Sequence, residues 1–162
     1  MSLAVGIEVF LPCSPREAFE CWTQRDVIKL WWGADGVCRV GAWVSDVRSG
    51  GGWQATFEEA DGSRFTARGD YNVVQEPHCV AWTWWANWNP DTTLAIMMTF
   101  TSREDGTHFK FACEGFRSKA ERDEGQRRWS QIIGWLEQHL SSTASQAVRQ
   151  QRGTAANPHD SA

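Results

Sequence analysis

Apolar residues between positions 119 and 140 recur with the period of an α-helix. Trp129, Ile132, Ile133, Leu136 and Leu140 are spaced i, i+3, i+4, i+7 and i+11, which places them on one stripe of a helix whose other positions are mostly charged. At about 1.5 Å per residue the segment would be roughly 33 Å long, enough to cross the sheet of a small domain. We therefore expect a long C-terminal helix that packs its stripe against a sheet.

The rest of the chain is dominated by apolar residues at every second position, which is typical of strands with one buried face. Turn-forming residues, such as Ser49-Gly50-Gly51-Gly52 and Asp61-Gly62, separate the runs. Strands joined by successive hairpins form an antiparallel sheet. The pattern predicts about seven strands, at residues 3–11, 37–48, 53–59, 64–75, 79–86, 92–102 and 107–114.

Two short helices are expected between the first and second strands. Ser14 has the character of an N-cap, Pro15 suits the first helical position, and Glu17 stands at the capping-box position. One helix should run from there to about residue 22, and a second over residues 25–32. Helices this short are unstable alone, so both should pack against the sheet. The predicted fold class is α+β, a curved antiparallel sheet wrapped around the long C-terminal helix.

One domain accounts for the chain. Its 162 residues, 41% of them hydrophobic, are enough for a single core. After Leu140 the apolar stripe disappears and the sequence becomes polar. We therefore expect a domain over residues 1–142 and a disordered C-terminal tail over residues 143–162.

The net charge and the hydropathy of the sequence limit the classes of partner that the protein is expected to bind. The formal charge is −4 and no cluster of Lys or Arg is present, which argues against a nucleic-acid partner. No apolar run reaches about 18 residues, so we expect no membrane span. The N-terminus lacks the pattern of a signal peptide, and we therefore expect a cytoplasmic protein.

Motifs for catalysis or metal binding are absent from the sequence. The five cysteines are odd in number and include no CxxC pair, so reduced thiols are expected. The four histidines do not cluster, and no HExxH, GxSxG or P-loop motif occurs. We predict no metal site and no cofactor, and the sequence identifies no catalytic residue.

Several local strings, taken in order, resemble the START-like or SRPBCC superfamily of helix-grip folds, and more closely its branch related to the activator of the heat-shock protein 90 ATPase. The resemblance covers roughly residues 3–140. The strings include Ser14-Pro15-Arg16-Glu17-Ala18-Phe19, Trp31-Trp32-Gly33, Asp46-Val47-Arg48-Ser49-Gly50-Gly51-Gly52-Trp53, Gly69-Asp70-Tyr71 and Glu114-Gly115-Phe116.

This resemblance implies a deep, largely apolar cavity between the sheet and the long helix. It does not imply one activity, because the fold includes lipid and hormone binders, polyketide cyclases and hydrolases. The Asp-x-Arg-x-Gly-Gly string is interpreted as architectural: a charged pair at a strand end, followed by a flexible turn.

The aromatic residues give the candidate binding site. Eleven tryptophans accompany a single tyrosine, and Trp53, Trp82, Trp84 and Trp129 share the inward phase of their strands or the helix stripe with other aromatic residues. Such bulk fills a core, but in a fold with a cavity it also suits a flat aromatic or lipid-like guest. The candidate ligand-binding residues are Trp32, Trp53, Phe57, Tyr71, Trp82, Trp84, Met98, Phe111, Trp129 and Ile133.

Three functional hypotheses follow. The preferred one is a protein that binds a small hydrophobic, aromatic or lipid-like molecule. The first alternative is an enzyme on the same cavity, a cyclase, lyase or hydrolase, with polar contact from Tyr71, an arginine or water. The second is a co-chaperone that regulates an ATPase. Trp85, Trp88 and Met97 lie outside the inward phase and indicate either a homodimer face or a covering loop.

Overall fold

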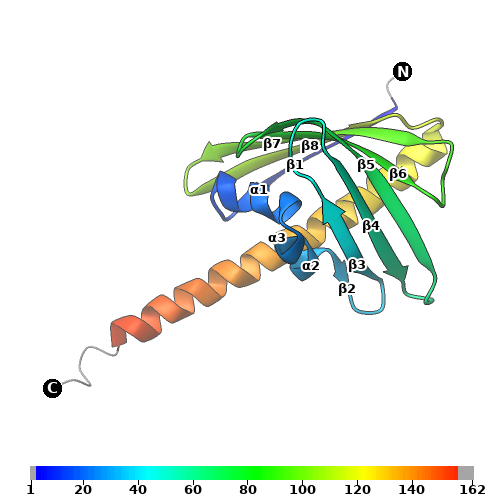
Figure 1. The fold of residues 1–162 in the computed structure, drawn as a ribbon. Coiled ribbons are helices and arrows are strands. Elements are labelled where there is room, and N and C mark those ends of the chain that lie inside the picture. The colour runs from blue at the N-terminus through cyan, green and yellow to red at the C-terminus, as the bar shows by residue number, and fades with distance from the viewer. Residues whose placement is uncertain (1–2, 157–162) are drawn as a thin grey trace.

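The structure, a computed structural model, describes residues 3–156, with side chains described for residues 3–144. Three helices and eight strands follow one another along these described residues (Figure 1). They are β1 (Ala4–Leu11), α1 (Pro15–Thr23), α2 (Arg25–Trp31), β2 (Gly33–Ala34), β3 (Cys38–Ser45), β4 (Gly52–Glu59), β5 (Arg64–Gln75), β6 (Cys79–Ala86), β7 (Thr93–Arg103), β8 (Gly106–Glu114) and α3 (Lys119–Ala156).

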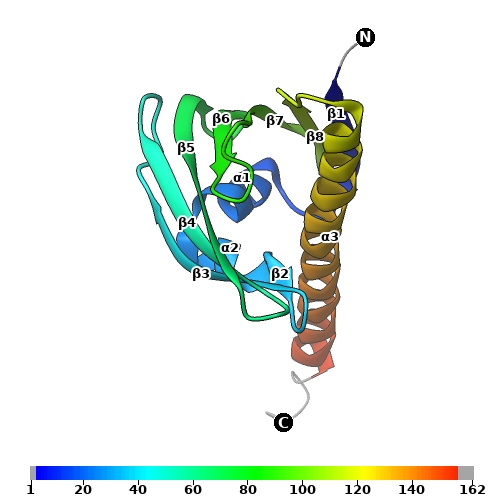
Figure 2. The ribbon, with the colours of Figure 1, turned by 90° about the vertical axis from the view of Figure 1, so that its right-hand side faces the viewer.

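All strands belong to one antiparallel sheet in the order β1-β8-β7-β6-β5-β4-β3-β2. Every neighbouring pair from β2 to β8 is also consecutive in sequence, as the hairpin turns predict. Only β1 pairs with a distant strand, β8. The sheet curves around α3, while α1 and α2 lie within its concave side (Figures 1 and 2). The helix-grip prediction is therefore confirmed.

The structure has eight strands, whereas about seven were predicted. The additional strand is β2, two residues that pair with Arg39 and Cys38 of β3. A segment this short cannot show a period of two, so the pattern of apolar residues does not reveal it.

Local capping explains where the helices begin. The Glu17 backbone N–H donates to Ser14 Oγ at 3.2 Å, so Ser14 is the predicted N-cap of α1. At the start of α3, the Glu121 backbone N–H donates to Ser118 Oγ at 3.1 Å. The Glu121 carboxylate in turn accepts from the Arg117 backbone N–H at 3.1 Å. The first turn of α3 is thus fixed by reciprocal side-chain bonds.

The apolar stripe of α3 faces the sheet as predicted. Trp129, Ile133, Leu136 and Leu140 are buried, and Ile132 is half-buried. Burial of a large apolar side chain contributes roughly 1.5–3 kcal/mol, so this stripe accounts for much of the docking of the helix. Within residues 3–156, no helix is long and apolar enough to cross a membrane.

The C-terminal segment differs from the prediction. Residues 143–162 were expected to be a disordered tail, but α3 continues to Ala156. In Figure 1 these last turns project beyond the edge of the sheet. The helix thus extends through residues 143–156, the division of the chain at residue 142 stays a prediction, and residues 157–162 lie outside the described residues.

Candidate functional site

A cavity of about 650 Å³ lies between α3 and the strands β4, β5 and β6. Its apolar wall is largely aromatic and comes from the sheet, the end of α2 and the inner face of α3. Its polar groups come mainly from the first half of α3. The aromatic lining residues are Trp32, Phe57, Phe65, Trp84, Trp88, Phe116, Trp129 and Trp135.

Four of the ten candidate ligand-binding residues line this cavity: Trp32, Phe57, Trp84 and Trp129. The Trp32 and Trp84 rings stack with centroids 5.8 Å apart and planes inclined by 3°. Trp129 meets Trp84 edge-on at 5.1 Å. Together these indoles form a rigid aromatic wall.

The other six candidates are buried but do not line the cavity. Instead, their side chains fill the space inside the curved sheet next to other aromatic rings. Trp53 stacks on Trp43 at 5.2 Å, and Tyr71 stacks on Trp82 at 6.4 Å. The residues in this group are Trp53, Tyr71, Trp82, Met98, Phe111 and Ile133.

Four buried polar atoms in this filled region have no hydrogen-bond partner among the described residues. They are Nε1 of Trp22, Trp43 and Trp82 and the hydroxyl of Tyr71. Burial raises the pKa of Tyr71 to about 12, with a smaller opposing effect of the Ser45 side chain. Tyr71 therefore stays neutral at physiological pH, and it lies away from the cavity where the enzymatic alternative would need it.

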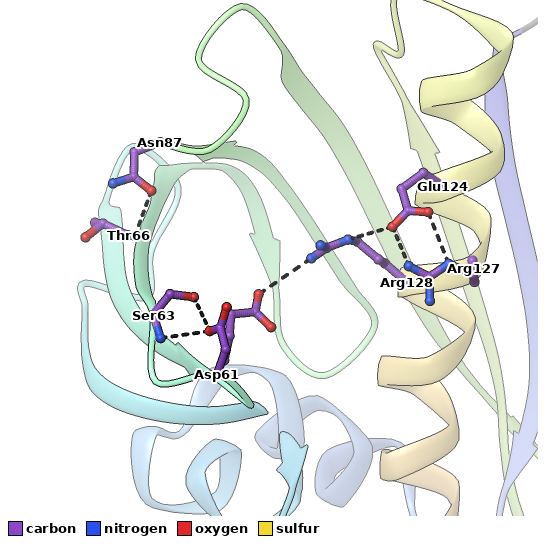
Figure 3. A network of polar contacts seen from close by, with 8 residues as sticks. Asp61, Ser63, Thr66, Asn87, Glu124, Arg127 and Arg128 are labelled. Atoms are coloured by element: carbon purple, nitrogen blue, oxygen red, sulfur yellow. Dashed lines mark hydrogen bonds and ion pairs between the residues drawn. The ribbon is translucent and has the colours of Figure 1, made fainter. Parts of the chain in front are cut away.

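The charged rim of the cavity centres on Glu124 of α3. Arg127 Nε donates to Glu124 Oε2 at 3.1 Å, and Arg128 Nε donates to Glu124 Oε1 at 3.1 Å (Figure 3). A further bond joins Arg127 Nη2 to Glu124 Oε1. The hydrogen bonds from Arg127, and then from Arg128, lower the pKa of the Glu124 carboxyl. This carboxylate is thus ionised and already paired.

Arg128 crosses from α3 toward the β4–β5 hairpin (Figure 3). Its Nη1 lies 4.0 Å from Oε1 of Glu59, the last residue of β4. Its guanidinium carbon lies 4.7 Å from the centroid of the Trp88 ring, a distance typical of a cation–π contact. Glu59, Trp88 and Arg128 all line the cavity.

Turn chemistry holds the partners of Arg128 in place. In the β4–β5 hairpin, the Ser63 backbone N–H donates to Asp61 Oδ1 at 2.9 Å (Figure 3). The Glu59 N–H donates to Ser63 O at 2.8 Å. After β6, Asn87 Oδ1 accepts from the Thr66 N–H at 3.0 Å. These bonds fix the end of β4 and the loop that carries Trp88.

Cys38 also lines the cavity, directly opposite Glu59 in the β3–β4 ladder. Burial raises the pKa of the Cys38 thiol to about 11; Glu59 raises it further and Arg128 lowers it. The thiol is therefore protonated at neutral pH and is a weak nucleophile. It belongs to the lining, as the sequence-based interpretation of reduced cysteines expects.

At the other end of the cavity, Thr92 Oγ1 donates to Glu121 Oε1 at 2.8 Å. Burial alone would raise the pKa of this carboxyl, but the hydrogen bonds from Thr92 and the Arg117 backbone outweigh it and the pKa is lowered. Because Glu121 also caps the helix, its carboxylate oxygen stabilises the start of α3.

The polar lining residues Glu59, Glu124 and Arg128 were not among the candidates. Their signal was present but weak. Glu124 and Arg128 are an i, i+4 pair on the charged face of the helix, and such pairs are usually solvated surface. The sequence does not show that this face meets the end of β4.

The three side chains predicted to lie outside the inward phase, Trp85, Trp88 and Met97, have different surroundings. Trp88 is 49% exposed and stands at the cavity. Trp85 donates its Nε1–H to Pro90 O at 3.0 Å, and the Arg68 guanidinium lies 4.3 Å from its ring centroid. Met97 is half-exposed on β7. The loop after β6 contacts Trp85, whereas Trp88 belongs to that loop and is exposed, and the homodimer face stays a prediction.

Residues 12–141 match the family model described as Activator of Hsp90 ATPase homolog 1-like protein. No curated protein matches the chain. In the described part of the chain, no group of three or more His, Cys, Asp or Glu side chains is placed to hold a metal ion.

Solved structures share the fold at low sequence identity. CV1439 from Chromobacterium violaceum superposes with a TM-score of 0.76 and 14% identity over 85% of this chain and 96% of that chain. Ms6760 from Mycobacterium smegmatis superposes with a TM-score of 0.74 and 16% identity over 88% of this chain and 90% of that chain. DynU16, a protein of the dynemicin biosynthetic locus, gives 0.71 and 16% over 88% of this chain and 49% of its own.

Proposed function

Because the chain belongs to the family of Activator of Hsp90 ATPase homolog 1-like proteins, we propose that it binds a small hydrophobic molecule in the cavity between α3 and the sheet. An aromatic guest suits this site best, since aromatic side chains form most of its apolar wall. The fold of this family is consistent with ligand binding, and the identity of the guest is our own inference.

The observation that carries the proposal is the cavity itself. Its volume of about 650 Å³ falls within the range of roughly 300–1,000 Å³ that is usual for sites of small molecules. The cavity persists although six of the candidate aromatic and apolar residues pack into a filled core beside it. A predominantly apolar, aromatic wall beside a limited set of polar side chains, here mainly from α3, suits a binding site for such molecules.

Ligand binding can be tested by thermal shift and calorimetry with a panel of aromatic, polyketide-like and fatty-acid compounds. A ligand that binds only the folded state raises the melting temperature with concentration. Intrinsic tryptophan fluorescence should change in parallel, because Trp32, Trp84 and Trp129 line the cavity. We expect saturable binding of at least one aromatic compound.

A pair of matched variants locates the binding. Ile132 is half-buried on α3 and lines the cavity, so Ile132→Trp should fill it and weaken binding at least tenfold. Ile7 is half-buried on β1 away from the cavity, so Ile7→Trp should leave affinity unchanged. Equal affinity of the Ile132→Trp variant and the parent protein would place the guest elsewhere, and no binding by the whole panel would argue against the proposal.

A further inference from the structure

Arg128 has hydrogen-bonding capacity left over at the cavity surface. Only its Nε takes part in a hydrogen bond with the described residues, to Glu124. A guanidinium carries five N–H donors, four of them on its two terminal nitrogens. Stacking on Trp88 and the bond to Glu124 restrain the group, so these terminal donors are presented in a fixed position.

Glu59 supplies an acceptor across a short gap. Its Oε1 lies 4.0 Å from Arg128 Nη1, which is longer than a hydrogen bond of about 2.7–3.2 Å. One oxygen atom close to both groups reaches both, if it accepts a hydrogen bond from Arg128 and donates one to Glu59. A hydroxyl group has this combination of donor and acceptor.

We propose that the Glu59–Arg128 pair recognises the hydroxyl group of an aromatic ligand, so that the guest is a phenol or a similar hydroxylated ring compound. The hydroxyl oxygen accepts from Arg128 Nη1, its hydrogen is donated to Glu59 Oε1, and the ring lies on the aromatic wall of the cavity. Both bonds involve an ionised partner and are stronger than bonds between neutral groups.

The neighbouring charges favour a neutral hydroxyl over a carboxylate. Arg127 is already bonded to Glu124 through two of its nitrogens, and Glu124 accepts three hydrogen bonds from the two arginines. A carboxylate guest at Arg128 would stand beside the Glu59 carboxylate and be repelled by it. An ammonium guest would face the Arg128 guanidinium. Of the charged side chains Glu59, Glu124, Arg127 and Arg128, only Arg128 keeps both terminal nitrogens free of hydrogen bonds with described residues, and only the Glu59 carboxylate accepts none.

This inference rests on the proposed function, because it requires an aromatic guest in the cavity. The two are separated by three probes with the same ring system: 2-naphthol, 2-naphthoate and 2-methylnaphthalene. Binding of 2-methylnaphthalene tests the cavity alone. The ratio of the 2-naphthol affinity to the affinities of the other two probes tests the polar pair. Affinities can be measured by ligand-observed NMR or calorimetry at neutral pH.

For the parent protein we expect 2-naphthol to bind roughly tenfold or more tightly than either other probe. Glu59→Gln removes the repelling charge, so the preference for 2-naphthol over 2-naphthoate should fall at least tenfold. Glu58→Gln is the matched control, because Glu58 is the adjacent residue of β4 and does not line the cavity. It should leave the preference unchanged.

Arg128→Met should weaken 2-naphthol at least tenfold and leave 2-methylnaphthalene unchanged, which also shows that the variant is folded. Arg68→Met is the matched control: it removes a guanidinium that stacks on Trp85 and does not line the cavity, and it should keep the preference for 2-naphthol. Equal affinity of all three probes for the parent protein, or an unchanged preference in Glu59→Gln, would overturn the inference and leave the proposed function standing. Failure of all three probes to bind would overturn this inference, whereas the proposed function fails only if the whole panel of compounds does not bind.

Discussion

At the scale of single residues, Gly69 shows how the sheet accommodates its large aromatic side chains. The β5–β6 ladder pairs Arg68 with Trp85 and Tyr71 with Trp82, but not the residues between them. In this opening, Trp53 Nε1 donates to Thr83 O at 3.0 Å. A Cβ atom at Gly69 would lie 1.9 Å from Thr83 O and 2.7 Å from Trp53 Nε1. Only glycine leaves room for this indole.

Gly69→Ala should therefore lower the free energy of unfolding by at least about 2 kcal/mol, because the clash involves a backbone oxygen that cannot move aside cheaply. Gly6→Ala on β1 is the control. An added Cβ there meets no atom within 4 Å, so stability should stay the same or rise by up to about 1 kcal/mol. Urea denaturation measures both, and equal stability of the two variants would contradict the tight approach of Trp53.

The sequence predicts which strand residues face the interior, but not which of these interior residues border the cavity. The period of two correctly assigned Trp53, Tyr71, Trp82 and Trp84 to the buried face of the sheet. It could not tell that Trp84 borders a cavity while Tyr71 and Trp82 fill the core, because that depends on how far α3 stands from each strand. Glu59 was missed for a related reason: its partner is 69 positions away in α3.

At the scale of elements, α3 determines both stability and the site. Trp129 is the first residue of the helix stripe, with ring centroids 4.9 Å from Phe111 and 5.1 Å from Trp84. One helix thus contributes the buried stripe and most of the charged rim. The stripe was predicted in full from the sequence, because a period of 3.6 residues is unambiguous over five positions.

Trp129→Ala should cost roughly 3–5 kcal/mol of unfolding free energy, as expected for a large-to-small change in a core. Trp88→Ala serves as the control. Trp88 is 49% exposed, and its removal should cost about 1 kcal/mol or less, mainly through the contact with Arg128. Chemical denaturation of both variants gives the comparison, and a Trp129→Ala variant as stable as the parent would place Trp129 outside the core.

The end of α3 was not predictable in the same way. Beyond Leu140 no apolar stripe remains, and a polar segment without one has no visible reason to stay ordered. The helix nevertheless continues to Ala156, since residues such as Ala, Gln and Arg favour helical backbone once a helix has been nucleated. The sequence shows where a helix docks better than where it stops.

Deletion of residues 143–162 should change the melting temperature by less than about 2 °C, because α3 projects beyond the sheet in this region (Figure 1). Differential scanning calorimetry of the truncated and full chains tests this. A larger decrease would show that the segment docks on the domain or on another copy.

At the scale of the whole molecule, ionisable groups buried in the core make the stability of the fold depend on pH in the alkaline range. Burial, with a smaller effect of Glu114, raises the pKa of the Cys113 thiol to about 12. Burial likewise raises the pKa of Cys13 and of Cys21 to about 12, with smaller effects of nearby carboxylates, and Tyr71 also reaches about 12. Close packing of the aromatic core excludes water, and this burial keeps the thiols and the tyrosine protonated.

These shifts predict that the folded state loses stability as the pH rises from about 9 to 12. An unfolded thiol ionises near pH 8.5 and an unfolded tyrosine near 10, whereas the buried groups keep their protons until about pH 12. The unfolded state therefore binds fewer protons in this window, and each group lowers the unfolding free energy by up to roughly 1.4 kcal/mol per pH unit. Below the unfolded pKa values the contribution is fully present.

Urea denaturation at pH 8, 9, 10 and 11 in a reducing buffer measures the slope. Cys113→Val removes one buried ionisable group, so its slope above pH 9 should be shallower than that of the parent by up to about 1.4 kcal/mol per pH unit. Cys79→Val is the control, because Cys79 is only half-buried and burial raises its pKa less. Identical slopes for the parent and Cys113→Val would mean that Cys113 ionises in the folded state, and hence that water reaches the core between β8 and α3.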